Sequence, residues 1–173
     1  MKRQLIIVNG FSGSGKDLFC ECCEKYLEPR VYTTVKHSSD YPKSILYDMG
    51  WNGERTPKIR KLLADMCEFC AENGSSLKAL FNFIDSPIFA FEAVFYHERD
   101  PKEIQKIVSY YKCSDTVQVT TVLIKRTAAE QVEVDRWGIE NYGYDYVIGN
   151  NSTLAHLNLA AVLFCQDVIE RGD

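Results

Sequence analysis

The sequence has no long hydrophobic run, no excess of positive charge and no repeated or low-complexity segment. No apolar stretch approaches the roughly 20 residues that a transmembrane helix needs. The N-terminal segment also lacks the apolar region and the small-residue cleavage site of a secretory signal. We therefore expect a cytoplasmic protein with no membrane partner. The formal net charge of −4 argues against a nucleic-acid partner, because such binding depends on lysines and arginines that neutralise phosphates.

The seven cysteines are an odd number in a chain without an export signal, which favours reduced thiols over a disulfide framework. Cys20 and Cys23 share the two-residue spacing of a zinc knuckle, as do Cys67 and Cys70. Both pairs fall in stretches typical of helices, where residues three apart share one face. We therefore favour core thiols for both pairs, with zinc as the alternative.

Stretches typical of strands alternate with stretches typical of helices along the chain. Two helices have clear start signals, Thr56 before Pro57 and Asp100 before Pro101, and Ser152 is the expected cap of the last helix. This alternation predicts a single three-layer α/β/α domain around a five-stranded parallel sheet. The expected strands are 4–9, 30–35, 91–98, 116–126 and 145–150, and the expected helices are 16–26, 41–51, 55–74, 76–87, 100–111 and 152–171.

Residues 10–16, "GFSGSGK", follow the first predicted strand and open the first predicted helix. They fit the G-x-x-x-x-G-K pattern of a phosphate-binding loop in the context that this pattern requires. Glycines let successive amides point at phosphate oxygens, the helix start adds its positive end, and Lys16 reaches the terminal phosphates. The alternative is a plain Gly/Ser turn between strand and helix. We favour the P-loop NTPase fold with ATP as the ligand.

Asp17 stands where a phosphate loop normally carries a serine or threonine hydroxyl that binds Mg²⁺. A carboxylate is also a hard oxygen ligand that Mg²⁺ accepts. Asp17 is therefore the expected metal ligand. No strand-end pair of acidic residues marks a second metal carboxylate, which leaves Glu98 as the other candidate for the surroundings of Mg²⁺. His97 is either a ligand-positioning residue or a packed strand residue.

Transfer of a phosphoryl group between phosphates requires positioned cations and a metal, and no nucleophile from the protein. Cationic residues lie at the ends of predicted elements, where a planar guanidinium can hold two phosphate oxygens at once. One group, at the ends of the middle elements, can clamp an acceptor phosphate, and a second group flanks a polar segment that can close over the transferred group as a lid. The first group is Lys43, Arg60 and Arg99, and the second is Lys125, Arg126 and Arg136.

"SGSGKD" resembles the phosphate loop of animal-type phosphomevalonate kinases and bacteriophage deoxynucleoside monophosphate kinases, which carry Gly-Lys-Asp. Four further segments are similar: "DYPK", "TPKIRKLL", "YHERDPKEI" and "GIENYGYDYVIGN". The resemblance implies a small-molecule kinase of the nucleoside monophosphate kinase superfamily. It places acceptor-binding roles on Asp40, Lys43, Arg60 and Arg99, and a nucleotide-binding role on Asn150.

Together, residues and resemblance predict a single kinase domain over 1–173, with an acceptor-binding region at about 36–85 and a short lid at about 126–142. The expected catalytic residues are Lys16, Arg99, Arg126 and Arg136. The expected ATP-binding residues are Gly10, Ser12, Gly13, Ser14, Gly15, Lys16, Asp17, Leu18 and Asn150, with Mg²⁺ on Asp17.

The acceptor remains open between a (deoxy)nucleoside monophosphate, which we favour, and a phosphomevalonate-type small molecule. The lid segment is shorter than that of phosphomevalonate kinases, and the large insertion of the phage enzymes is missing. A switch or sensor that binds ATP without transferring it is the other class. Such a protein needs the glycine loop but has no need of a second phosphate clamp. The acceptor-side cations therefore favour the kinase.

Overall fold

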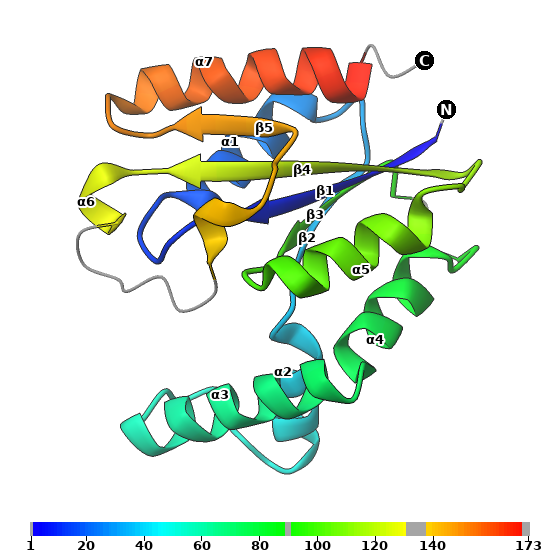
Figure 1. Ribbon diagram of the computed structural model, residues 1–173, viewed down its shortest axis with the longest axis vertical. Helices are drawn as coiled ribbons and strands as arrows, with labels where there is room; N and C mark the ends of the chain where they lie inside the picture. The colour runs from blue at the N-terminus through cyan, green and yellow to red at the C-terminus, as the bar shows by residue number, and fades with distance from the viewer. Residues whose placement is uncertain (1, 89–90, 131–137, 171–173) are drawn as a thin grey trace. The chain divides into compact units, whose positions relative to one another are not determined.

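The computed structural model describes residues 2–88, 91–130 and 138–170 (Figure 1). Its centre is a sheet of five parallel strands in the order β2-β3-β1-β4-β5. Helices flank the sheet, which confirms the predicted three-layer α/β class with a P-loop NTPase-like fold. The strands are β1 (Arg3–Asn9), β2 (Thr33–His37), β3 (Ala93–His97), β4 (Val117–Lys125) and β5 (Tyr146–Gly149).

The chain divides into two compact units, residues 1–36 with 90–173 and residues 37–89. In the first unit, α1 (Lys16–Leu27) and α7 (Leu154–Cys165) cover one face of the sheet, and α5 (Pro101–Tyr111) covers the other (Figure 1). The shorter helical segments of this unit are α6 (Thr127–Glu130), η1 (Ile139–Asn141) and η2 (Gln166–Glu170).

The central strand β1 carries a continuous apolar run, residues 5–8, because both of its faces are covered. Ile6 and Val8 are fully buried in a core that includes residues of α1 and α7. Leu5 and Ile7 are also fully buried, and alternation along a strand directs them to the opposite face. A near-continuous apolar run is typical of parallel strands that are buried on both sides, and it identified this strand from the sequence.

The second unit is helical, with α2 (Asp40–Asp48), α3 (Pro57–Glu72) and α4 (Ser75–Ile84) packed on one another. Its residues, 37–89, nearly coincide with the predicted acceptor-binding region at 36–85. The acceptor-binding role of this region stays a prediction. Across the part of the chain that the structure describes, no helix combines the length and the apolar character needed to cross a membrane.

Two of the three predicted helix caps are present. The Thr56 hydroxyl accepts a hydrogen bond from the amide of Ile59 at 3.3 Å, and the Asp100 carboxylate accepts one from the amide of Lys102 at 2.8 Å.

The prediction for the last helix was wrong by one residue. Thr153 caps α7 by accepting from the amide of His156 at 3.4 Å. The Ser152 hydroxyl instead contacts the ring of His156, with its Oγ 2.9 Å from Nδ1.

Strand β2 begins at Thr33, three residues later than predicted. The turn that follows α1 explains the shift. The amides of Arg30 and Val31 both donate to the carbonyl of Leu27, at 2.8 and 3.1 Å. Because these residues are held in the turn, they are not available to the sheet.

Phe19 of α1 is fully buried and meets Phe164 of α7 edge-on, with the ring centroids 5.5 Å apart. We expect Phe19→Ala to lower the free energy of unfolding by about 3–5 kcal/mol, because it leaves a cavity under both helices. Chemical denaturation measures this change. Leu159→Ala is the control, because Leu159 lies on α7 with 57% of its surface exposed. Equal losses in the two variants would contradict the packing described here.

Candidate functional site

The loop between β1 and α1 bends through three glycines with positive φ angles, Gly10 at 146°, Gly13 at 77° and Gly15 at 95°. Residues other than glycine rarely adopt these backbone conformations. A Cβ atom at Gly10 would also lie 2.4 Å from the carbonyl oxygen of Ile124, and one at Gly15 would lie 2.3 Å from Nδ2 of Asn150. Gly10 is therefore required both by conformation and by the lack of space beside the backbone of β4, whereas at Gly15 the neighbouring group is a side chain and the backbone conformation is the main requirement.

The interior of the loop is suited to an anion. Gly15 is the N-cap residue of α1 and has no side chain to satisfy the first amides of the helix, so the positive end of the helix dipole faces the loop. Ser14 is fully buried, and its hydroxyl has no hydrogen-bond partner among the described residues. An unpaired buried hydroxyl costs about 1–3 kcal/mol. A phosphate oxygen in the loop would remove that cost by accepting a hydrogen bond from the Ser14 hydroxyl.

Lys16 folds back over the loop. Its Nζ donates to the carbonyl oxygens of Gly10 at 2.6 Å and Phe11 at 2.8 Å. The ammonium group is therefore held against the backbone of the loop by two charge-assisted hydrogen bonds.

Residues from the ends of β4 and β5 also contact the loop. Asn150 donates from Nδ2 to the carbonyl of Ser14 at 2.8 Å, and Arg126 donates from Nη1 to the carbonyl of Gly13 at 3.3 Å. The structure thus brings both of these predicted site residues to the loop. Lys125 forms an ion pair with Glu140.

Asn9 is a site residue that the sequence analysis missed. Its side chain is fully buried at the end of β1. Its Oδ1 accepts from the amide of Gly10 at 2.7 Å, while Nδ2 donates to the carbonyl of Arg99 at 3.1 Å and to the hydroxyl of Tyr144 at 2.8 Å. Tyr144 in turn donates to the carbonyl of Ile139 at 3.0 Å. The available signal in the sequence was that Asn9 is a polar residue directly after the apolar run at residues 5–8.

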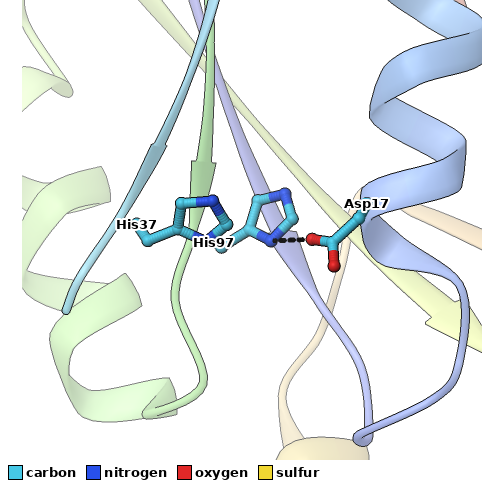
Figure 2. Close-up of side chains that lie close together, drawn as sticks. All are labelled: Asp17, His37 and His97. Atoms are coloured by element: carbon cyan, nitrogen blue, oxygen red, sulfur yellow. Dashed lines mark ion pairs between the residues drawn. The ribbon is translucent and has the colours of Figure 1, made fainter. Parts of the chain in front are cut away.

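Asp17 lies in the first turn of α1, beside the buried imidazole of His97 (Figure 2). Nδ1 of His97 is 3.3 Å from Oδ1 of Asp17, and the two side chains are 8% and 80% exposed. Nε2 of His97 lies 3.2 Å from the sulfur of Cys20. Burial raises the pKa of the Cys20 thiol well above its usual range, as expected for a cysteine packed in a core.

Asp17 fits the role of a cation ligand. Its carboxylate is exposed at the end of the phosphate loop, where a divalent ion could contact both a side-chain oxygen and a bound phosphate. His97, which the sequence left undecided between a packed and a positioning residue, is both buried and directed at this carboxylate.

Glu98 follows β3 and is 7% exposed. Its Oε1 accepts from the amides of Arg99 at 2.7 Å and Asp100 at 3.0 Å. Burial raises the pKa of Glu98 to about 7, and the charges of Glu103 and Asp100 act in the same direction, while the two amide bonds oppose them. Glu98 thereby holds the backbone that carries Arg99 and begins α5.

The raised pKa of Glu98 predicts a pH-dependent stability. Between its ordinary pKa of 4.5 and about 7, the folded protein keeps a proton that the unfolded chain has lost, so stability falls as the pH rises through this window. Glu98→Gln keeps an oxygen that can accept from both amides but removes the titration. We expect the wild type to lose about 2 kcal/mol relative to this variant between pH 5 and pH 8.

Denaturant unfolding of both proteins at the two pH values tests this prediction. Glu72→Gln, which changes an exposed carboxylate on α3, is the control and should follow the wild type. Parallel pH profiles for the wild type and Glu98→Gln would show that Glu98 titrates normally.

The predicted acceptor residues other than Arg99 belong to the second unit. Asp40 accepts from the amide of His37 at 2.8 Å, and its other oxygen is 3.4 Å from Nζ of Lys43. Arg60 is exposed in the first turn of α3. Ser12, Gly13 and Leu18 are exposed around the loop. Arg136 lies outside the described residues.

Comparison with known proteins finds structures of similar fold but no matching family. No family model matches the chain, and no curated protein matches it in sequence. The crystal structure of APE1195 has a TM-score of 0.56 at 12% identity over 97% of each chain. A chain in the structure of a Pnkp1/Rnl/Hen1 complex has a TM-score of 0.44 at 15% identity over 83% of this chain and 44% of that one. TT1252 from Thermus thermophilus has a TM-score of 0.42 at 16% identity over 95% of this chain and 98% of that one.

These identities are too low to transfer an activity. The likeness to APE1195 covers nearly the whole of both chains and supports the overall fold. The sequence motif and the geometry of the loop between β1 and α1 are those of a phosphate-binding P-loop, as found in nucleotide-binding folds.

Proposed function

We propose that this protein is a phosphotransferase that moves the γ-phosphoryl group of ATP to the phosphate of a small acceptor, with a (deoxy)nucleoside monophosphate as the favoured acceptor. The observation that carries the proposal is the loop over residues 10–16. It combines three positive-φ glycines, the buried unpaired hydroxyl of Ser14 and the lysine at its mouth. Each of these features is explained by a bound chain of phosphates.

On the donor side, the loop amides and Lys16 bind the β- and γ-phosphates of ATP. Lys16 leaves its two loop carbonyls and moves to the phosphates, where its charge is needed. Arg126, which contacts the carbonyl of Gly13, neutralises charge on the transferred group. Mg²⁺, when bound at Asp17, supplies positive charge that offsets the charge of the phosphates.

On the acceptor side, we assign the acceptor's phosphate to Lys43, Arg60 and Arg99. Two of these are guanidinium groups, which suit the paired oxygens of a phosphate. Asp40 contacts Lys43 and positions its ammonium group. Arg99 is on a backbone segment that Asn9 and Glu98 hold in place.

An oxygen of the acceptor's phosphate attacks the γ-phosphorus directly, while the bond from that phosphorus to the β–γ bridging oxygen breaks and ADP leaves, so no covalent protein intermediate is needed. The protein's contribution is to hold two phosphate-bearing molecules in line and to balance their charge.

Lys16→Ala tests the donor site. We expect kcat to fall by at least about 100-fold, because the variant removes a cation that faces charge developing in the transition state. ADP release from Mg·ATP is measured with ribo- and deoxyribonucleoside monophosphates, phosphomevalonate and dephospho-coenzyme A as acceptors.

Lys25→Ala is the matched control, since Lys25 is exposed in the last turn of the same helix. Near-normal turnover in Lys16→Ala would refute the donor site. Binding of ATP without acceptor-dependent turnover would replace the kinase with a switch or sensor, and turnover with phosphomevalonate alone would move the acceptor to that class.

Arg60→Ala tests the acceptor side. We expect the KM of the acceptor to rise by about 10- to 100-fold, because a charge-assisted hydrogen bond contributes about 1.5–3 kcal/mol, while the KM of ATP changes little. Lys61→Ala is the control, because Lys61 is the exposed neighbour that pairs with Asp65 at 3.0 Å. A larger rise in the KM of ATP than in that of the acceptor would place Arg60 on the donor side.

A further inference from the structure

We propose that Asp17 and His97 bind one divalent cation together, and that this carboxylate–imidazole pair makes the site prefer transition-metal ions such as Mn²⁺ and Co²⁺ over Mg²⁺. The inference deepens the proposed function, on which it rests for the presence of a phosphate ligand beside the ion. It concerns the identity of the metal and adds a ligand, His97, to the one expected from the sequence.

The first argument is that the side chains near the loop differ in type from those that commonly bind Mg²⁺ in P-loop proteins. A P-loop protein commonly binds Mg²⁺ through a loop hydroxyl and an acidic side chain elsewhere in the site. Here the acid is on the loop, at Asp17, and the neighbouring strand β3 ends in His97, which lies in register with Val8 of β1. The side chain from the strand therefore offers nitrogen in place of oxygen.

The second argument is distance. Nδ1 of His97 and Oδ1 of Asp17 are 3.3 Å apart. Two ligands bound to one ion at about 2.1 Å, with an angle between the octahedral and tetrahedral values, lie about 3.0–3.4 Å apart. The two atoms therefore already stand at the separation of neighbouring ligands. Their distance is longer than the roughly 2.9–3.0 Å of a typical N–H···O hydrogen bond.

The third argument is the orientation of the imidazole ring. Nε2 faces the sulfur of Cys20 at 3.2 Å inside the core, so the other nitrogen, Nδ1, is directed at Asp17. With its proton on Nε2, the ring donates to the sulfur and presents a bare Nδ1 to an ion. Histidine ligands of metals commonly donate their second ring nitrogen to a neighbouring group in this way, which fixes the ring.

The fourth argument is access. The imidazole is 8% exposed and the carboxylate 80% exposed, so one ligand is fixed in the core and the other faces solvent. Coordination positions on the solvent side remain for water and for phosphate oxygens. The site is therefore open in the manner of a catalytic metal centre and not closed like a structural one.

The preference follows from the chemistry of the two ligands. Mg²⁺ binds oxygen and keeps most of its waters, whereas imidazole suits the first-row transition metals. Among ions that a nucleotide tolerates, one neutral nitrogen ligand strengthens the binding of Mn²⁺ and Co²⁺ and gives Mg²⁺ no comparable gain.

The test measures the dissociation constants of Mn²⁺ and Mg²⁺ on the full chain, with and without a non-hydrolysable ATP analogue, by calorimetry and by competition followed with Mn²⁺ electron paramagnetic resonance. His97→Asn is the central variant, because its amide can donate to Asp17 from near the position of Nδ1 but offers no imidazole nitrogen. We expect the ratio of Mg²⁺ to Mn²⁺ dissociation constants to fall by about tenfold or more in this variant, mainly through weaker Mn²⁺ binding. His156→Asn, which changes an exposed histidine on α7, should leave the ratio unchanged.

Two further measurements keep the inference falsifiable if His97→Asn folds poorly. Asp17→Ser alters an exposed side chain and should abolish Mn²⁺ binding in the absence of nucleotide. Co²⁺ on the wild type should show visible absorption bands of a nitrogen-containing ligand set. Co²⁺ absorption indistinguishable from that of the ion bound to oxygen ligands would overturn the inference, as would Mn²⁺ binding that Asp17→Ser leaves intact.

An unchanged metal ratio in a folded His97→Asn protein would also overturn it, and would mean that His97 only orients Asp17. The metal titrations contain no acceptor, so they separate this inference from the proposed function. Acceptor-dependent turnover together with an unchanged ratio would retain the kinase and reject the ligand role of His97. A changed ratio without turnover for any acceptor or metal would do the opposite.

Discussion

The approach of the backbone at Gly10 to the carbonyl of Ile124 is the constraint on which the site depends. A side chain at position 10 would push the loop away from β4, because its Cβ would lie 2.4 Å from that oxygen. The close approach turns the chain sharply after β1 and lets α1 begin with its amides directed back at the loop. Lys16 and Asp17 then fall in the first turn of the helix.

A set of polar contacts ties the surrounding strand ends to this loop. Asn9 joins the start of the loop to the carbonyl of Arg99 and to Tyr144. Asn150 and Arg126 donate to carbonyls of the loop itself. Three neighbouring strands, β1, β4 and β5, therefore end at one loop, which is the arrangement expected where an open parallel sheet binds its ligand.

The loop could be predicted from the sequence because its signal is local. Seven consecutive residues, an apolar strand before them and a helix after them are all visible within one short stretch. The pairing of Asp17 with His97 joins residues 80 positions apart and leaves no local pattern, nor does the contact between Asn9 and Tyr144. The sequence around His97 fitted a packed strand residue equally well, because this side chain is buried and also directed at Asp17. The cap of α7 was misplaced for a different reason, since Ser152 and Thr153 are adjacent and both are good capping residues.

The two hydrogen bonds of Lys16 to carbonyls of its own loop compete with any anion for its ammonium group. Any anion that recruits the ammonium group must replace both bonds. Inorganic phosphate presents a single small cluster of oxygens, whereas a nucleoside triphosphate presents several along the length of the loop and can also meet the Ser14 hydroxyl and the amides of α1. For the proposed nucleotide, these two bonds would favour a polyphosphate over a small anion.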